Sequence, residues 1–212
     1  MTDVRAAYVV AARTAAMLLA SPAVAAGWDR PSALERYAVS GLAGHLGGQI
    51  FFAERALAGP EPGTAPLAIL DYYARVAWMT TGHDSPEHVR IRRGSEQAAA
   101  AGPADLAARA AAAVDRLPDL FAATPASRLV QLPTWRWTLT FDDFLRSRLV
   151  ELAVHIDDLA VSVDLPTPPL PPWVTEPVLD LLSRLAVRRH GPVALLRTLS
   201  RAERAPDTVA AL

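Results

Sequence analysis

Apolar residues recur along most of this chain at the spacing of an α-helix. Near the N-terminus they follow one another at alternating steps of four and three residues: Val4, Tyr8, Ala11, Ala15 and Leu18. Such steps place apolar side chains on one face of a helix. With the accompanying start and stop residues, the pattern predicts helices over residues 3–20, 40–58, 66–81, 103–117 and 141–163, another that begins at residue 85, and two more in the last 40 residues.

Residues with known capping preferences mark several of these boundaries. Ser40 is predicted to cap the second helix, and Ser85, which is followed by a proline, to cap a later one. Thr140 opens a sequence that resembles a capping box, with Asp143 in place of the usual glutamate. His190 precedes a glycine and is expected to close the first of the two C-terminal helices. These signals indicate a chain that is helical nearly throughout.

Two segments depart from the helical pattern. Residues 129–140 alternate β-branched and aromatic residues with polar ones, which is typical of a short strand or hairpin. Residues 165–172 read LPTPPLPP and cannot form a helix, so they are expected to be a stiff linker. The sequence therefore predicts an all-α protein. We expect an up-and-down four-helix bundle over residues 1–165, a short β-hairpin, and a Pro-rich linker with a helical appendage over residues 166–212.

Composition and charge narrow the range of functions. The chain has 212 residues, a formal net charge of −1 and no cysteine. Because Arg90, Arg92 and Arg93 form the one basic cluster, we expect no nucleic-acid partner. No apolar run reaches the length of a membrane span. Ala23, Val24 and Ala25 resemble a signal cleavage site, but an ordinary amphipathic helix is the preferred interpretation, and we expect a cytoplasmic protein.

The helix predicted over residues 141–163 carries ionisable groups where a bundle helix normally carries apolar ones. Its inward stripe comprises Phe141, Leu145, Arg148, Leu152, His155 and Leu159. Glu151 lies one turn before His155, and residues four apart on a helix project side by side. A carboxylate and an imidazole in this arrangement can bind one metal ion. An ordinary salt bridge between Glu151 and His155 is the alternative.

A histidine on the second helix adds to this picture. His45 lies in the sequence SGLAGHLGGQIFF, with Gly41, Gly44, Gly47 and Gly48 around it. Each glycine in a helix interior costs about 0.8–1 kcal/mol relative to alanine. Several of them around one histidine indicate that a backbone or a ligand approaches closely. Tight helix packing around a hydrogen-bonded histidine is the alternative.

The segments SGLAGHLGG and RLVELAVHIDDLAVSV, about a hundred residues apart, together resemble the mycothiol-dependent maleylpyruvate isomerase family, which belongs to the DinB-like metal-dependent bundles. The C-terminal segment LLRTLSRAERAPDTVAAL is also similar to the tail of such proteins. The resemblance implies a DinB-like bundle in which His45, Glu151 and His155 bind a divalent metal, usually zinc. Two imidazoles and one carboxylate leave a tetrahedral zinc one open position, as in catalytic sites.

The family's cofactor is mycothiol, an external thiol, so the absence of cysteine from this chain is no obstacle. The resemblance implies a thiol-dependent enzyme, either an isomerase that acts on an activated alkene such as maleylpyruvate or a thiol S-transferase. It also implies a small-molecule thiol and an electrophilic substrate as partners. The alternatives are a DinB-like bundle that binds a metal or ligand without catalysis and can form a homodimer, and a purely structural helical protein.

Further residues are candidates for roles around this site. Arg148 is a candidate catalytic residue that would bind a substrate carboxylate, with a salt bridge to Glu151 or Asp142 as the alternative. Asp157 and Asp158 follow His155; Asp158 can orient that ligand, although a solvated face is preferred for both. His83 and His88 are expected to be surface residues without a role in the site. Trp135 and Trp137 are expected to pack against the bundle.

Overall fold

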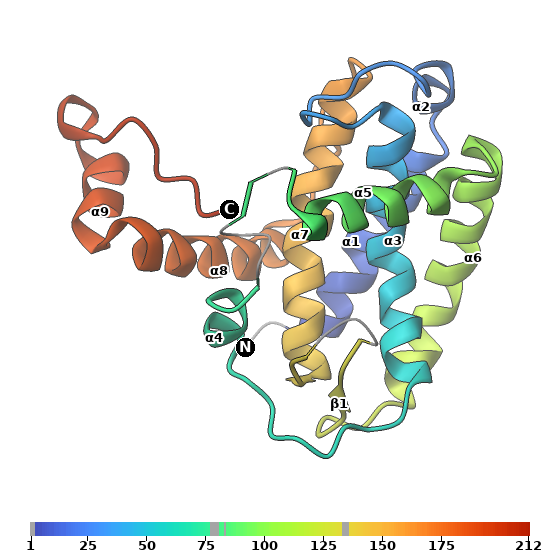
Figure 1. The fold of residues 1–212 in the computed structure, drawn as a ribbon, viewed down its shortest axis with the longest axis horizontal. Coiled ribbons are helices and arrows are strands. Elements are labelled where there is room, and N and C mark those ends of the chain that lie inside the picture. The colour runs from blue at the N-terminus through green and yellow to red at the C-terminus, as the bar shows by residue number, and fades with distance from the viewer. Residues whose placement is uncertain (1–2, 77–80, 83, 133–135) are drawn as a thin grey trace.

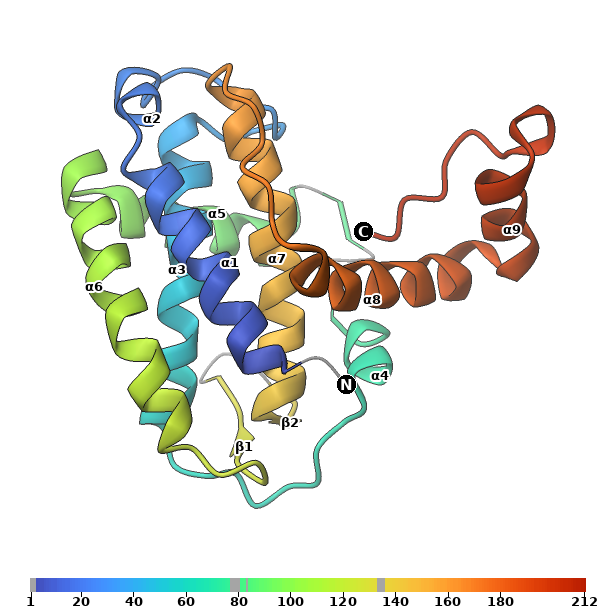
Figure 2. The same cartoon turned by 180° about the vertical axis from the view of Figure 1, so that it is seen from behind.

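The computed structural model describes residues 3–76, 81–82, 84–132 and 136–212. Four long helices form the body of the protein: α1 (Val4–Leu19), α3 (Val39–Ala58), α6 (Pro103–Ala122) and α7 (Phe141–Ser162). Figures 1 and 2 show α1 and α7 running in one direction and α3 and α6 in the other. Helix α5 (Pro86–Ala99) crosses the bundle and packs on α3. The chain then continues into α6, which runs parallel to α3. The predicted all-α bundle is confirmed, but its long helices do not alternate up and down as expected, because α5 carries the chain back so that α6 runs parallel to α3.

The other elements complete the chain. They are α2 (Pro22–Ala26), α4 (Ile69–Tyr73), β1 (Leu129–Val130), β2 (Leu139–Thr140), α8 (Pro172–His190), α9 (Pro192–Ser200) and a 3-10 helix (Ala202–Arg204). Strands β1 and β2 pair antiparallel, with Leu129 opposite Thr140, so the predicted short hairpin exists but is only two residues long on each side. Among the described residues, no helix is both long and apolar enough to cross a membrane.

Three predicted helix boundaries need correction. Ser40 is not the cap of α3, because the helix begins at Val39 and backbone carbonyls of the preceding loop accept hydrogen bonds from the N–H groups of Val39 and Ser40. The helix predicted over residues 66–81 is reduced to α4, since the N–H of Leu67 donates to the carbonyl of Thr138 at 2.9 Å and holds that end extended. Residues 77–80 lie outside the described residues.

The third correction concerns α6, which was predicted to end near Leu117 and continues to Ala122 through Pro118. Burial explains the extension. Phe121 packs in the core, with its ring centroid 5.8 Å from that of Tyr8 and 5.4 Å from that of Phe141. The packing of this aromatic cluster outweighs the one backbone hydrogen bond that a proline removes. By contrast, the capping predictions for Ser85 and Thr140 are confirmed, since both side chains accept hydrogen bonds from the first turns of their helices.

The C-terminal helices form an arm that projects from the bundle (Figures 1 and 2). The first part of α8 shares the core of the bundle through buried residues such as Val174 and Val178, and contacts α1 and α7. Helix α9 has no buried residue. As predicted, α8 ends at His190, and Gly191 follows with a positive φ of 83°. The division of the chain into two units at residue 165 stays a prediction.

Candidate metal centre

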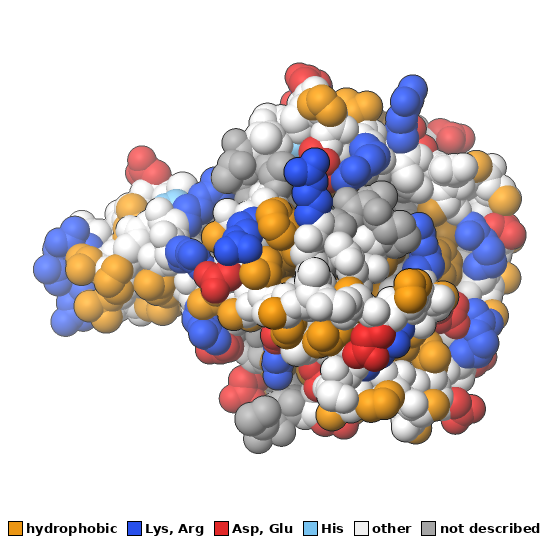
Figure 3. Space-filling view, turned by 60° about the horizontal axis from the view of Figure 1, so that its bottom comes forward, with side chains coloured by type: hydrophobic (Ala, Val, Ile, Leu, Met, Phe, Trp, Pro, Cys, Tyr) orange, Lys and Arg blue, Asp and Glu red, His pale blue; other side chains and the backbone are white. Residues whose placement is uncertain are grey.

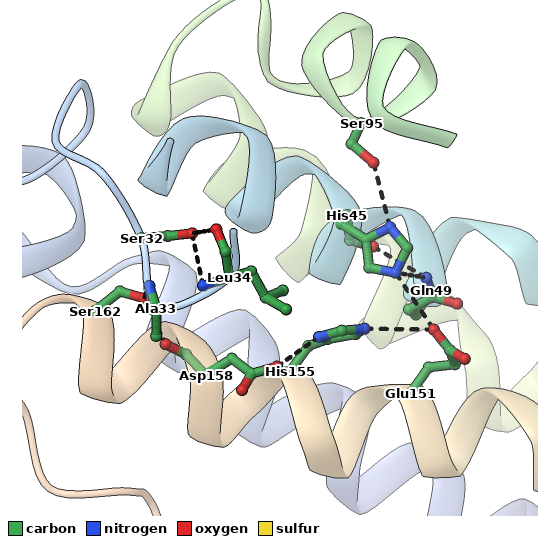
Figure 4. Close-up of polar contacts among 10 residues, drawn as sticks. All are labelled: Ser32, Ala33, Leu34, His45, Gln49, Ser95, Glu151, His155, Asp158 and Ser162. Atoms are coloured by element: carbon green, nitrogen blue, oxygen red, sulfur yellow. Dashed lines mark hydrogen bonds and ion pairs between the residues drawn. The ribbon is translucent and has the colours of Figure 1, made fainter. Parts of the chain in front are cut away.

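Helices α3 and α7 lie side by side, and each turns ionisable side chains toward the other (Figure 4). His45 comes from the middle of α3, while Glu151 and His155 come from successive turns of α7. The side chains of the three residues are 16%, 11% and 15% exposed. The structure therefore brings together the three residues that the sequence selected, at the edge of the core and within reach of solvent.

The glycines around His45 explain how α5 covers this site. A Cβ atom built on Gly44 would lie 2.0 Å from the backbone oxygen of Ser95, so α5 can approach this closely only because the residue is glycine. This close approach places Ser95 Oγ 3.2 Å from His45 Nδ1. The prediction that a backbone approaches the glycine-rich turn is confirmed at this position. At Gly48, in contrast, no atom of the described residues lies within 4 Å of an added Cβ.

The distances among the three side chains suit a metal ion. Glu151 Oε2 lies 3.3 Å from His45 Nε2 and 3.4 Å from His155 Nε2. One ligand atom from each residue falls within 4.8 Å of the other two. Two ligands bound to zinc at about 2.0–2.1 Å with tetrahedral angles are separated by about 3.3–3.4 Å. Among the described residues, this is the one cluster of potential metal ligands.

In both imidazoles, the nitrogen that faces away from the three converging ligand atoms, Nδ1, has a hydrogen-bond partner of its own. His45 Nδ1 lies 3.2 Å from Ser95 Oγ, and that hydroxyl donates to the carbonyl of Ile91 at 2.9 Å. His155 Nδ1 lies 2.9 Å from the Asp158 carboxylate. Metal-bound histidines characteristically donate their second ring N–H to such a carboxylate or oxygen, which fixes the ring and leaves the other nitrogen for the metal. The residues present therefore fit a divalent metal.

The preferred interpretation of Asp158, a side chain on a solvated face, needs correction. Its side chain is 24% exposed and accepts a hydrogen bond from His155, whereas Asp157 is exposed and accepts one from Thr167. The backbone around Asp158 is also tied down: its carbonyl accepts from Ser162 Oγ, which in turn accepts from the N–H of Ala33 at 2.8 Å. Figure 4 shows this chain of contacts from the 32–34 loop to the imidazole.

Burial and neighbouring charges set the protonation of the cluster. Burial would raise the pKa of Glu151, but hydrogen bonds from His155 and His45 and the charge of Arg148 hold the pKa of that carboxyl well below its ordinary value. Burial lowers the pKa of His45, against the hydrogen bond to Glu151. For His155, the hydrogen bonds to Asp158 and Glu151 outweigh burial and raise the pKa to about 9. A cationic His155 therefore balances the Glu151 carboxylate in the metal-free protein.

Arg148 lies one turn before Glu151 but points into the core, with only 6% of its surface exposed. Its guanidinium donates to Gln49 Oε1 at 2.8 Å, and its Cζ atom lies 5.9 Å from the centroid of the Phe144 ring. The alternative of a salt bridge to Asp142 is wrong, because the Asp142 carboxylate is bound by Arg5 at 2.8 Å. Sequence reasoning missed the pairing of Arg148 with Gln49, which depends on how α3 and α7 pack.

None of the other candidates among the described residues belongs to the cluster. His88 belongs to the first turn of α5 and is half-buried, while His83 lies outside the described residues. Trp137 packs against the core, with Arg75 Cζ 5.5 Å from the centroid of its ring, and Trp135 is not among the described residues. The packing role expected for Trp137 is therefore confirmed.

A hollow of about 410 Å³ opens beside the cluster, lined by the loop of residues 29–38. Tyr37 belongs to this lining, and its ring centroid lies 6.2 Å from that of His45. Leu34 also lines the hollow, and Figure 4 shows its side chain directed toward His155. The hollow thus adjoins two residues, Leu34 and Tyr37, that face the imidazoles of the cluster.

Comparison with known proteins agrees with this geometry. A sequence model of the family described as mycothiol maleylpyruvate isomerase N-terminal domain matches residues 9–160. The chain belongs to this family. The matched range runs from α1 into the last turn of α7 and contains His45, Glu151 and His155, whereas the C-terminal arm lies beyond it. No curated protein and no solved structure matches the chain. Family membership indicates a mycothiol-related, metal-dependent function.

Proposed function

We propose that this protein is a zinc enzyme that uses mycothiol, or a similar low-molecular-weight thiol, to transform an electrophilic small molecule in the cytoplasm. The observation that carries the proposal is the convergence of His45, Glu151 and His155, with both imidazoles anchored through Nδ1. Two nitrogens and one oxygen leave a tetrahedral metal one exchangeable position. The cytoplasm is the compartment in which small thiols stay reduced.

When bound, the metal supplies a positive charge that favours the thiolate form of a coordinated thiol at neutral pH. With a metal bound, the Glu151 carboxylate would neutralise part of its charge. Ser95 and Asp158 would keep the two histidine ligands oriented. Leu34 and Tyr37 line the neighbouring hollow. We propose that the hollow receives the part of the thiol or substrate that does not react. The reaction is cis–trans isomerisation of an activated alkene such as maleylpyruvate, or thiol S-transfer.

The experiment combines metal analysis with thiol turnover. Purified protein loaded with zinc is incubated with mycothiol and maleylpyruvate, and product is followed by mass spectrometry and by the absorbance of the alkene. We expect one zinc per chain and thiol-dependent turnover. His155→Ala is expected to lose both, and Arg136→Ala, which changes an exposed residue, neither. Wild-type protein that holds zinc but reacts with no thiol and acceptor would support a metal- or ligand-binding bundle without catalysis.

We also propose that the C-terminal arm mediates self-association into a homodimer. Large apolar side chains are exposed along α8 and α9: Leu179, Val187, Val193, Leu196 and Leu199. Residues 184–204 contain six arginines and one glutamate, a formal charge of +5, so the rest of the chain, with a total of −1, carries −6. Figure 3 shows basic and apolar side chains together on the arm. A second copy of the chain offers the complementary charge.

Sedimentation equilibrium tests this assignment. We expect wild-type protein to form a dimer that dissociates at high salt, because screening weakens attraction between exposed charges. Leu196→Glu combined with Leu199→Glu is expected to give a monomer, whereas Met17→Glu, at an exposed apolar residue of α1, is the matched control and leaves the dimer intact. Wild-type protein that is monomeric at all concentrations would refute the proposal.

A further inference from the structure

The loop of residues 29–38 borders the candidate metal centre on one side. Figure 4 shows the side chain of Leu34 directed toward His155. The ring centroid of Tyr37 lies 6.2 Å from that of His45, and the two rings meet edge to face. Both side chains of the loop are half-buried and pack against the core. An apolar side chain and an aromatic ring therefore stand beside the two imidazoles, although neither can bind a metal ion.

The ring of Tyr37 packs tightly on the first turn of α3. A Cβ atom built on Gly41 would lie 3.2 Å from Tyr37 Cδ1, which is closer than nine in ten real Cβ contacts. The ring can therefore take this position because residue 41 has no side chain. Gly41 belongs to the glycine-rich sequence around His45, in which Gly44 admits the backbone of α5. The two glycines thus allow Tyr37 and α5 to approach the same histidine.

Hydrogen bonds within the loop fix the position of Leu34. The N–H of Ser32 donates to the carbonyl of Tyr37 at 2.9 Å, and the N–H of Tyr37 donates to the carbonyl of Leu34 at 3.1 Å. The Ser32 hydroxyl also accepts a hydrogen bond from the N–H of Leu34 at 3.2 Å. The N–H of Ala33 donates to Ser162 Oγ at 2.8 Å, and this contact ties one side of the loop to α7.

An ion pair ties the other side of the loop to the turn that precedes α5. The guanidinium of Arg36 binds the carboxylate of Asp84, which comes directly before the Ser85 cap of α5. Arg36 also lies 3.6 Å from the carboxylate of Glu35, its neighbour in the chain. Its φ of 68° is disfavoured for a residue with a Cβ atom and persists only where surrounding contacts maintain it. The loop is thus attached to both α7 and the start of α5.

We propose that Leu34 and Tyr37 are specificity-determining residues, which limit the size of the group that can bind next to His45 and His155. The ion pair between the loop and the turn before α5 holds the two side chains in place. Carbon atoms in contact are about 3.5–4.0 Å apart, so a ligand that is branched beside its binding atom collides with these side chains more readily than an unbranched one. The inference rests on the proposed metal-dependent function, because a size limit has an effect only where a ligand binds.

The experiment measures ligand binding rather than turnover. Protein loaded with cobalt in place of zinc is titrated with imidazole and with 2-methylimidazole, which carries one methyl group beside its binding nitrogen, and the visible absorption of cobalt reports binding. We expect wild-type protein to prefer imidazole. Leu34→Ala and Tyr37→Ala are each expected to lower this preference about 10-fold, the effect typical of one methyl-sized change in a pocket. Tyr37→Phe keeps the ring and is expected to keep the preference. Leu120→Ala, at a half-buried leucine of a second hollow, is the matched control and leaves it unchanged.

Further variants test how the loop is held. Arg36→Gln and Asp84→Asn are each expected to lower the preference by about 2–5-fold, the range expected for an exposed ion pair. High salt is expected to have the same effect on wild-type protein. Arg36→Asp combined with Asp84→Arg restores the pair with its charges exchanged and is expected to recover the wild-type preference. Arg116→Gln, which breaks the ion pair of α6 with Glu54 on α3, is the matched control and has no effect.

Several results would overturn the inference. One is a cobalt-loaded protein that binds neither imidazole, because no open position then exists for the loop to restrict. Another is a preference for imidazole that stays at its wild-type value in both Leu34→Ala and Tyr37→Ala. A preference that survives both Arg36→Gln and Asp84→Asn would refute the role of the ion pair. If the preference responds as expected but wild-type protein shows no thiol chemistry, the proposed thiol-dependent function fails and the size limit stands.

Discussion

Gly44 is the point where the glycine-rich turn of α3 meets the backbone of α5, and its replacement by alanine tests how these helices pack. A Cβ atom at this position would lie 2.0 Å from the backbone oxygen of Ser95 and 2.9 Å from its carbonyl carbon. Real Cβ atoms essentially never come closer than 3.0 Å to another heavy atom. In Gly44→Ala, α5 must therefore move away from α3 by at least 1.0 Å. Ser95 moves with it, away from His45.

The size of the expected loss of stability follows from a comparison of Gly44→Ala with Gly48→Ala. Both substitutions gain about 0.8–1 kcal/mol of helix propensity. Against the part of the chain that the structure describes, only Gly44→Ala overpacks the interface, which typically costs about 1–3 kcal/mol, since none of the described atoms lies within 4 Å of a Cβ at Gly48. The propensity gain is common to both variants and cancels in their difference. We predict that Gly44→Ala is less stable than Gly48→Ala by about 1–3 kcal/mol.

Urea unfolding of the two metal-free variants, followed by circular dichroism, measures this difference. Zinc titration supplies a second readout: Gly44→Ala is expected to bind zinc about 10–100-fold more weakly than wild type, because displacement of Ser95 frees the Nδ1 side of His45. Gly48→Ala is expected to bind zinc normally and to be more stable than wild type. Equal stability of the two variants would refute the close approach of α5, and equal zinc affinity would refute the anchoring role of Ser95.

Three further predictions concern the metal centre. His155→Ala is expected to lose stoichiometric zinc while its circular dichroism spectrum stays helical; zinc retained in the purified variant would contradict the ligand assignment. Asp158→Asn is expected to weaken zinc binding by about 10–100-fold, whereas Asp157→Asn, at an exposed neighbour, leaves it unchanged in the same competition assay. Because a pKa of about 9 makes His155 cationic in the metal-free protein, zinc must displace one proton below that pH. Zinc affinity measured by competition is then expected to fall about 100-fold from pH 7.5 to pH 5.5, and equal affinities would exclude ligation by His155.

Local patterns in the sequence determined the helices and the identity of the clustered side chains. The period of the apolar residues identified the four bundle helices, because each buries one face against the others. The spacing of Glu151 and His155 placed them side by side, since four residues are close to one helical turn. The caps at Ser85 and Thr140 were also local, as each side chain bonds the first turn of its own helix. Boundaries set by distant contacts, such as the start of α4, were predicted wrongly.

Only the tertiary structure decided how the site is completed. Ser95 reaches His45 because Gly44 lets α5 approach, and no local signal in α5 identifies that serine. Gln49 and Arg148 are 99 residues apart and meet only because α3 and α7 pack face to face. Asp158 has the sequence pattern of a surface residue, but in the fold it contacts His155, and the loop of residues 32–34 binds the same end of α7 through Ser162. Local sequence therefore specifies which side chains lie on each helix face, whereas the packing of those faces specifies their hydrogen-bond partners, because long-range contacts have no fixed spacing along the chain.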